Sequence, residues 1–593
     1  METTHDVVIC GGGLAGLTFA RQLSREQPDL RVALIEPSVR PLPEAAHKVG
    51  ESTVEVGTRY LGTTLGLKPY LDSQHLPKNG LRFFSGDNRG PFQDRVEFGP
   101  FEFPPVPSYQ LDRGKLENDL RAMLEEETTI ELREGQKVDA IELGGHDEAH
   151  RVTISGDAGE ETLTTRWVVD ASGRRHLLRR QLDLSAPSRI LANSSWWRVP
   201  EKIDVAELVP ESETRWHTRD NHKNRWLSTN HLTGPGYWVW VIPLQNDHTS
   251  IGIVAETAHH PFETINTLER SYAWLKEHEP HLHARLEGVE VVDFLVRKQY
   301  SYSGKQFLST DRWAAIGEAA FFTDPLYSQG TDYITFANTY TARAIAEERQ
   351  GKLDPEMVSF ANEFMLALFR ANEDILSRSG EVFRYPDVFG AKLLWDYYYY
   401  WAYMAAWYFY GVPQMNLARQ RRFLAMGNEY ARISRYIQET VRAWAELRRF
   451  DGWKERTHVG LPDTLSVITD LHMQLDVQKD ADAAEARMAA DLEGAKEFAA
   501  EVLYRALVGV GRENAPELAR RIGLRDWDLP LDATRIGLQE GSRNARRDGY
   551  SRVARDLERL LGHPPGNGTP LSTLVEQALG HPVEASVSAT AHA

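Results

Sequence analysis

Short apolar runs and helical spacing alternate along the first part of the chain, and longer amphipathic patterns fill the last part. The run "VVIC" at 7–10 has the length of a buried strand, and "LTFARQLSRE" after it repeats apolar residues at helical intervals. The segment 236–245, "GYWVWVIPLQ", alternates as a half-buried strand does and places Trp238 and Trp240 on one face. From about residue 352 the spacing is helical. The pattern predicts an α/β fold, α+β overall, with a mostly helical C-terminal region.

The turn between the first strand and the first helix contains Gly11, Gly13 and Gly16 in the pattern G-x-G-x-x-G. The first glycine allows a tight turn, the second lets a pyrophosphate approach the backbone, and the third lets the helix pack closely on the strand. A second strand, "RVALIEP", ends at Glu36, whose carboxylate can accept hydrogen bonds from an adenosine ribose. These residues predict a dinucleotide site but do not distinguish NAD from FAD.

Three later segments resemble the split FAD domain of the glutathione-reductase-like flavoproteins. They are "YQLDRGKLENDLRAML", "WVVDASGRRHLLRR" and "RWAAIGEAAFFTDPLYSQG". The resemblance implies a Rossmann-like split FAD-binding domain with an inserted β-sheet substrate subdomain. The cofactor-binding residues that we expect on this basis are Gly11, Gly13, Leu14, Ala15, Gly16, Glu36, Arg113, Asp170, Gly317, Glu318 and Pro325.

Four further segments resemble the flavin-dependent halogenases, which include tryptophan, phenol and pyrrole halogenases. They are "KVGEST" (48–53), "PKNGLRFFSG" (77–86), the W-x-W-x-I-P segment (238–243), and F-x-x-P-x-x-S-x-G through Phe322, Pro325, Ser328 and Gly330. The resemblance covers roughly residues 5–350. The coincidence of the W-x-W-x-I-P segment with the other three is more specific than any one of them.

The resemblance implies that reduced FAD from a separate flavin reductase, dioxygen and chloride or bromide produce hypohalous acid, which passes to an essential lysine. Lys78 matches that lysine; as an isolated residue it would be interpreted as a solvated loop lysine. The halide would bind at Ser328, Gln329 and Gly330. Trp238 and Trp240 would form a wall on the flavin side. The implied reaction is halogenation of an electron-rich aromatic compound.

Two positions depart from the family pattern. Glu318 stands where many relatives have aspartate, which keeps the carboxylate but adds a methylene. Tyr327 stands where the free-tryptophan halogenases have a glutamate before the serine. The second departure favours the phenol or pyrrole branch, with a substrate that is free or held on an acyl or peptidyl carrier protein.

The same patterns predict how the chain is divided. We expect a halogenase-like module over 1–350, with FAD segments at about 5–75, 105–185 and 295–350, a substrate sheet at about 76–104 and 186–294, and a helical region over 351–593. Within the helical region, the aromatic segment 393–413 is either a buried helix or a wall of a substrate cavity. The arginine-rich segment 417–450 is either a solvated helix face or a docking site for an acidic carrier protein.

Composition narrows the possible partners and locations. The 593 residues carry a formal net charge of −17, which argues against a general nucleic-acid or membrane-surface binder. No apolar run approaches the ~18 residues that span a bilayer, and the N-terminus lacks a secretory pattern, so we expect a cytoplasmic protein. The single cysteine, Cys10, excludes an internal disulfide, and the histidine spacings predict no metal site.

Two alternative functions remain open at this point. An FAD-dependent monooxygenase or a geranylgeranyl-reductase-like flavoprotein would share the split FAD domain, and would oxidise NAD(P)H without a separate reductase. A flavin-binding protein that has lost catalysis would be consistent with Glu318 and with the missing glutamate at Tyr327.

Overall fold

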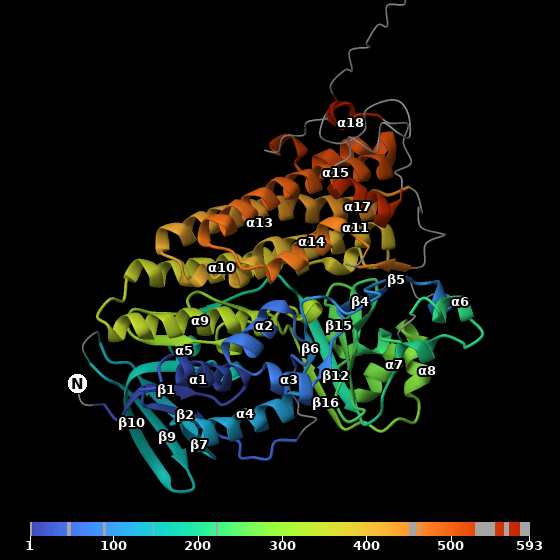
Figure 1. Cartoon of the computed structure of the whole chain (residues 1–593). Helices are drawn as coiled ribbons and strands as arrows, with labels where there is room; N and C mark the ends of the chain where they lie inside the picture. The colour runs from blue at the N-terminus through green and yellow to red at the C-terminus, as the bar shows by residue number, and fades with distance from the viewer. Residues whose placement is uncertain are drawn as a thin grey trace, which may run out of the picture.

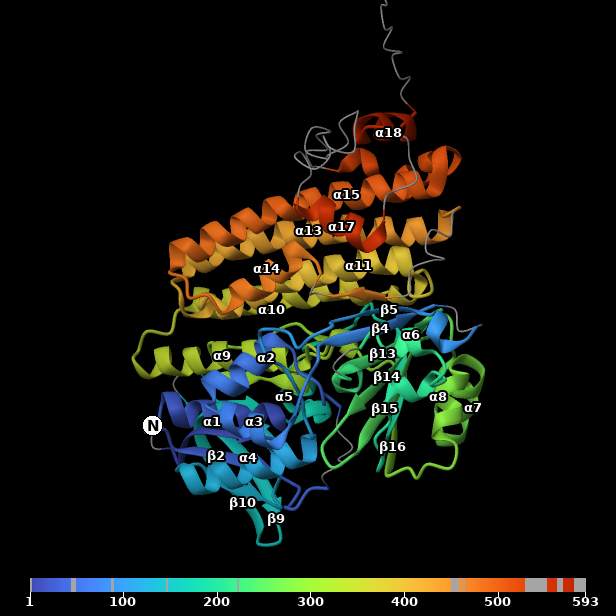
Figure 2. The same ribbon diagram turned by 45° about the vertical axis from the view of Figure 1, so that its right-hand side comes forward.

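The computed structural model describes residues 3–43, 49–86, 90–145, 148–220, 223–449, 458–461, 464–527, 552–562 and 569–580. Lys48, the first residue of the "KVGEST" segment, lies outside them. Two sheets lie next to each other, and the C-terminal helices stack above both of them as a separate layer (Figure 1). Figure 2 shows the same layering from a second direction, with helix α9 (Gly330–Arg349) beneath the C-terminal layer.

The first sheet has seven strands, most of them parallel, in the order β7-β2-β1-β10-β9-β8, with β18 paired to β10. Their bounds are β1 (His5–Cys10), β2 (Val32–Glu36), β7 (Glu131–Glu134), β8 (Lys137–Glu142), β9 (His150–Gly156), β10 (Gly159–Asp170) and β18 (Trp313–Ala315). Helix α1 (Leu14–Glu26) follows β1, and helix α4 (Arg113–Glu127) packs on α1. Because β1, β2, β10 and β18 are parallel, their carboxyl ends meet at one edge, where open α/β sheets bind ligands.

The second sheet has eight strands in the order β16-β12-β15-β14-β13-β4-β5-β19. Their bounds are β4 (Leu81–Ser85), β5 (Val96–Gly99), β12 (Ala192–Val199), β13 (Thr229–Gly234), β14 (Tyr237–Pro243), β15 (Thr249–Glu256), β16 (Asp293–Arg297) and β19 (His458–Gly460). Alternation along β14 gives the sheet two different faces. Trp238 and Trp240 belong to the main core, whereas Val239 packs with helices α7 (Leu268–His278) and α8 (Pro280–Leu286).

In its described residues, the C-terminal region is helical apart from one short strand. Its main elements are α10 (Pro355–Leu376), α11 (Pro386–Tyr399), the π-helical turn η10 (Tyr400–Ala405), α13 (Leu417–Leu447), α14 (Ser466–Leu475), α15 (Ala481–Arg521), α17 (Arg552–Leu561) and α18 (Leu571–Ala578). The exception is β19, which adds a parallel edge strand to β5. A three-residue strand is too short to show a period of two, so β19 could not be predicted from a hydrophobic pattern.

The arginines of α13 contact acidic side chains of the protein itself. Arg419 pairs with Asp482 at 2.7 Å, and Arg422 pairs with Glu485 at 2.6 Å, so the start of α13 is held against the start of α15. Arg449, just beyond α13, pairs with Glu513 of α15. These ion pairs within the protein explain the arginine-rich segment without an external partner.

Within the described ranges, no helix combines the length and the apolar composition needed to cross a bilayer. The same part of the chain contains no group of three or more His, Cys, Asp or Glu side chains arranged as metal ligands.

Candidate functional site

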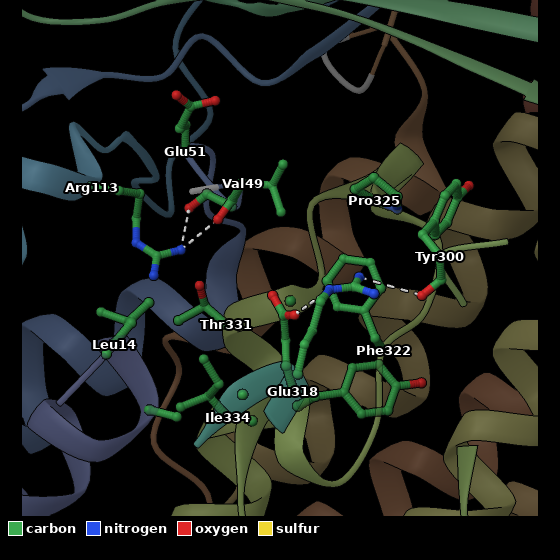
Figure 3. A pocket seen from close by; sticks show the side chains of 18 of the residues that line it. Leu14, Val49, Glu51, Arg113, Tyr300, Glu318, Phe322, Pro325, Thr331 and Ile334 are labelled. Atoms are coloured by element: carbon green, nitrogen blue, oxygen red, sulfur yellow. Dashed lines mark hydrogen bonds and ion pairs between the residues drawn. The ribbon is translucent and has the colours of Figure 1, made fainter. Parts of the chain in front are cut away.

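A cavity of about 480 Å³ opens at the carboxyl edge of the first sheet and extends to the β14 face of the second. Of the residues predicted to bind the cofactor, the cavity is lined by Gly11, Gly13, Leu14, Ala15, Glu36, Arg113, Gly317, Glu318 and Pro325. Figure 3 shows Arg113 and Leu14 on one side and Pro325 and Phe322 on the other. Segments that are far apart in the sequence therefore meet around one space.

Gly11 and Gly16 of the β1–α1 turn lie where side chains would not fit, whereas Gly13 faces open space. Gly11 has φ +127°, and a Cβ there would lie 2.3 Å from the Ala171 carbonyl oxygen. A Cβ on Gly16 would lie 1.9 Å from the carbonyl oxygen of Gly11, so Gly16 serves helix–strand packing and does not line the cavity. No atom lies within 4 Å of a Cβ built on Gly13, and this open side faces the cavity. The turn fits a bound pyrophosphate.

Glu36 closes the end of the cavity next to this turn. Its carboxylate accepts hydrogen bonds from the Gly12 amide at 2.7 Å and from the Ser38 amide at 2.9 Å. The fully buried Arg121 lies 3.7 Å from Glu36 and donates to the Gly12 carbonyl at 3.2 Å. A carboxylate fixed in this way can accept hydrogen bonds from a ribose. Arg121 was not predicted, because nothing in the sequence distinguishes it from other arginines of α4.

Arg113, the first residue of α4, is held by the backbone at Val49 and by Glu117. Its Nη1 donates to the Val49 carbonyl at 2.6 Å (Figure 3). Its Nη2 donates to Glu117 at 2.7 Å. A Cβ on Gly50, which has φ +91°, would lie 2.8 Å from Arg113 Nη1. The guanidinium therefore has a fixed place at the cavity wall.

Two of the predicted carboxylates have partners within the protein. Asp170 is buried and does not line the cavity; it accepts hydrogen bonds from the Ser172 and Leu178 amides, both at 2.9 Å. It shapes the loop whose residues line the cavity. Glu318 does line the cavity, and it forms an ion pair with Arg174 at 3.0 Å. Arg174 in turn lies over the Phe322 ring, with 4.8 Å between the guanidinium carbon and the ring centroid.

The predicted halide-binding residues form the start of helix α9. Ser328 has a left-handed backbone, Gln329 is the residue before the helix, and Gly330 is its first residue. The amides of the first helical turn have no acceptor within the helix, and the helix dipole favours an anion there. Ser328 and Gly330 line the large cavity, whereas the Gln329 side chain lines a different, smaller cavity.

Trp238 and Trp240 project from β14 into the wall of the large cavity. Their ring centroids are 5.7 Å apart, and Trp240 Nε1 donates to Ser250 Oγ at 3.1 Å. A Cβ on Gly252 of the neighbouring strand would lie 2.1 Å from the Trp240 ring, so this glycine provides the space for the indole. Next to them, burial lowers the pKa of His231 to about 3, which makes the imidazole neutral.

Lys78 lies in the smaller cavity, whose volume is about 50 Å³. It is only 2% exposed, and its Nζ donates to the Thr53 carbonyl at 2.7 Å. Burial lowers the pKa of Lys78 to about 7, although Glu55 and Asp332 act in the opposite direction. Lys78 is thus a desolvated amine and not a solvated loop lysine.

Residues before position 350 and residues of the C-terminal region together line the smaller cavity. Tyr327 and Gln329 contribute from one side, and the aromatic segment 393–413 contributes Tyr397, Tyr400 and Trp401. The aromatic segment is therefore both core and cavity wall. Tyr327 Oη donates to Asp396 at 2.5 Å, so Tyr327 is anchored to the helical region.

Among the lining residues that were not predicted, three show how weak the sequence signal was. Glu51 belongs to the quoted "KVGEST" segment and forms an ion pair with Arg198 at 2.7 Å. Glu55 follows that segment directly and lines the lysine cavity. Leu461, the residue after the short strand β19, lines the same cavity, and the sequence did not indicate that strand.

Comparison with known proteins agrees with this arrangement. Residues 4–283 match the FAD binding domain family. The flavin-dependent halogenase chlA of Dictyostelium discoideum is 31% identical over 353 residues, which are 55% of this chain and 57% of that protein. A 1H-pyrrole-2-carbonyl-[peptidyl-carrier protein] chlorinase of Pseudomonas fluorescens is 27% identical over 55% of this chain and 72% of its own length.

Solved structures show the same fold. The halogenase PltM superposes with a TM-score of 0.59 at 17% identity, over 84% of this chain and 96% of that one. The myxobacterial chondrochloren halogenase CndH superposes with a TM-score of 0.50 at 22% identity, over 64% of this chain and 82% of that one.

Fold and site together define an FAD-binding flavoprotein with a mixed α/β fold and a helical C-terminal region. Over 55% of its length, the chain is similar to flavin-dependent halogenases. The aligned region spans about 57% of the length of the Dictyostelium relative.

Proposed function

We propose that this protein uses reduced FAD, dioxygen and chloride or bromide to halogenate an electron-rich aromatic compound of the phenol or pyrrole type. The observation that carries the proposal is the position of Lys78: a buried amine in an aromatic-lined cavity, separated from the FAD cavity by the segment Tyr327–Gly330. In this proposal residues 1–350 form a split FAD domain of the glutathione-reductase type with the second sheet inserted as a substrate subdomain.

When bound, FAD supplies the oxidising power that turns halide into hypohalous acid. The chain's own part is to bind the halide near the cofactor. The first-turn amides of α9, at Gln329 and Gly330, are suited to an anion because they have no helical acceptor. Trp238 and Trp240 fill the opposite wall and keep an organic substrate out of the FAD cavity. Halide, being small, still enters.

Lys78 would receive the hypohalous acid on the other side of this segment. Its ammonium can donate a hydrogen bond to the oxygen of the acid, which makes the halogen more electrophilic. With a pKa of about 7, the amine is protonated in a large share of molecules near neutral pH and can also give up its proton. The surrounding aromatic side chains exclude water and orient the ring that is attacked.

The substrate preference follows from what lines the lysine cavity. Tyr397, Tyr400 and Trp401 offer flat apolar faces with polar tips, which suits a phenol or a pyrrole. Tyr327 replaces the glutamate that the free-tryptophan halogenases place there, so no carboxylate is available at that position for an amino-acid substrate. A separate flavin reductase is the expected partner, and a carrier protein is a second one if the substrate is tethered.

The test is an assay with FAD, a flavin reductase, NADH and either chloride or bromide. The substrates are phloroglucinol, which is bound with FAD in the PltM structure, resorcinol, and a pyrrole-2-carbonyl group on a peptidyl carrier protein, the substrate named for the Pseudomonas relative. Mass spectra of the products should show the halogen isotope pattern. Lys78→Met should remove these products, whereas Lys305→Met, at an exposed site, should not.

A different result would support the alternative function. NAD(P)H oxidation by the purified protein without a reductase, with hydroxylated and no halogenated products, would identify a monooxygenase or reductase. FAD binding without any turnover of these substrates or of the free halide would contradict the proposal.

A further inference from the structure

We propose that Glu55, held in place by His472 of the C-terminal helical region, is the base that accepts the ring proton when the aromatic substrate is halogenated. This inference rests on the proposed function. Tyr327 has no carboxylate, so the inference places the base on helix α2 instead. It also gives the C-terminal region, through His472, a part in positioning that base.

Glu55 and Lys78 line the same small cavity. Glu55 is the first residue of helix α2 (Glu55–Arg59), and Lys78 Nζ is bound to the carbonyl of Thr53, two residues before it. A ring between Lys78 and the aromatic wall would thus have a carboxylate within the same enclosed space. The side chains that face this space come from the FAD module and from the C-terminal helices.

His472 fixes the Glu55 carboxylate from the far side of the cavity wall. Its Nε2 lies 3.0 Å from Glu55 Oε1, and its side chain is 1% exposed. The Trp401 ring, which also lines the cavity, packs on the imidazole with 4.6 Å between the ring centroids. Helix α14, which carries His472, and helix α2 are therefore joined at this point by a buried hydrogen bond.

The charge of Glu55 suits a base. Burial raises the pKa of Glu55, but the hydrogen bond and charge of His472, the residue's own backbone amide and Lys78 together hold the pKa below its ordinary value. The group is therefore a carboxylate at neutral pH in spite of its burial.

Two other buried carboxylates near the cavity are committed elsewhere. Asp396 lines the cavity, but it accepts hydrogen bonds from Lys392 at 2.6 Å, Tyr327 at 2.5 Å and Gln438 at 2.8 Å. Asp332 does not line the cavity, and it accepts from the Gly57 amide and from Tyr400. Burial also raises the pKa of Asp332 well above its ordinary value, which favours the protonated form of that carboxyl. Glu55 is left as the carboxylate that can take a proton.

The bonds and protons balance as follows. The ring's π electrons form the carbon–halogen bond while the halogen–oxygen bond of hypohalous acid breaks. The released hydroxide takes a proton from the Lys78 ammonium and leaves as water. The ring carbon then loses its hydrogen as a proton to Glu55, and transfer of that proton to Lys78 restores both groups. The sum is arene plus hypohalous acid giving haloarene plus water.

The decisive experiment measures a deuterium isotope effect on resorcinol halogenation. With wild-type protein, loss of the ring proton should be fast, so resorcinol and ring-deuterated resorcinol should react at nearly the same rate. Glu55→Gln should lower kcat about 10- to 100-fold and raise the ratio of the two rates above about 2, because proton loss becomes slow. His472→Asn, at a positioning residue, should raise the ratio by a smaller amount. Glu55→Asp should partly restore the rate.

Two controls separate this inference from the proposed function and from misfolding. Glu501→Gln alters a buried carboxylate of α15 outside the cavity and should leave rate and isotope effect unchanged. Release of hypohalous acid is measured with monochlorodimedone. If wild-type protein releases none and halogenates no arene, the proposed function fails, and this inference with it. If Glu55→Gln binds FAD and still halogenates resorcinol at the wild-type rate, or slows without an isotope effect, Glu55 is not the base and only this inference fails.

Discussion

The large cavity and the cavity of Lys78 are built in different ways. One part of the wall of the large cavity is formed by backbone, at a glycine turn, a helix start and the ends of parallel strands. The small cavity is lined by side chains from residues before position 350, from the aromatic segment 393–413 and from Leu461. Backbone-built sites need particular residues at fixed spacings, which a sequence displays. Side-chain-built sites need only contact in space, which a sequence does not display.

The glycine turn gives the largest expected effect and tests the backbone-built side. Gly16→Ala should destabilise the fold by about 4 kcal/mol, because its Cβ would lie 1.9 Å from the Gly11 carbonyl oxygen. Gly13→Ala should leave the stability of the FAD-free protein unchanged, because its φ is −80° and its Cβ would meet open space. Its FAD affinity should nevertheless fall about 10- to 100-fold.

Calorimetry without FAD and titration with FAD check the two variants. Equal loss of stability in both would mean that the turn needs glycine for its own conformation alone. The comparison between the cavities would then lose its main support.

Lys78 tests the side-chain-built cavity through stability. Below pH 7 the lysine is charged in both the folded and the unfolded chain, so burial of the charge opposes folding in full. Lys78→Met should therefore raise the free energy of unfolding by about 2 kcal/mol at pH 6. This is a net value that includes the loss of the hydrogen bond from Lys78 to the Thr53 carbonyl.

The pH dependence has a definite sign. Between pH 7 and about 10 the folded protein carries a neutral lysine while the unfolded chain keeps the proton, so wild-type stability rises. The advantage of Lys78→Met should shrink over that range in thermal melts. An advantage that grows with pH, or a variant that is less stable at every pH, would contradict a desolvated Lys78.

Much of the large cavity was predictable, and little of the small one. Gly13 and Glu36 follow from a spacing with a physical reason, and Arg113 follows from the resemblance to split FAD domains; all three line the cavity. His472 is 417 positions from Glu55, and no local pattern marks a histidine that will meet a distant carboxylate. Asp170 shows a third case: its place at a strand end was readable, but its hydrogen bonds to Ser172 and Leu178 depend on how the loop turns.

The aromatic wall should have a moderate effect, on selectivity. Tyr397 lines the lysine cavity, whereas its neighbour Tyr398 points away and donates to the Asp491 carbonyl at 2.6 Å. Tyr397→Leu should change the ratio of kcat/KM for a bulky phenol to that for resorcinol about 10-fold, because it widens a cavity of about 50 Å³. Tyr398→Leu should lower stability and leave the ratio unchanged. The same ratio change in both variants would mean that general loosening, and not the cavity wall, sets selectivity.

The tryptophan pair should have the smallest effect. Both indoles project from β14 into the wall of the large cavity. Trp240→Ala removes an indole that fills the space over Gly252 and lines the FAD cavity. If the pair keeps organic substrates away from the cofactor, this variant should yield a small fraction of hydroxylated resorcinol beside the halogenated product. Val239→Ala, on the opposite face of the same strand, should yield none. Product analysis by mass spectrometry checks both variants. Unchanged halogenation without any hydroxylated product would leave the pair as packing between the sheet and the cavity, and substrate exclusion would then depend on the closed lysine cavity alone.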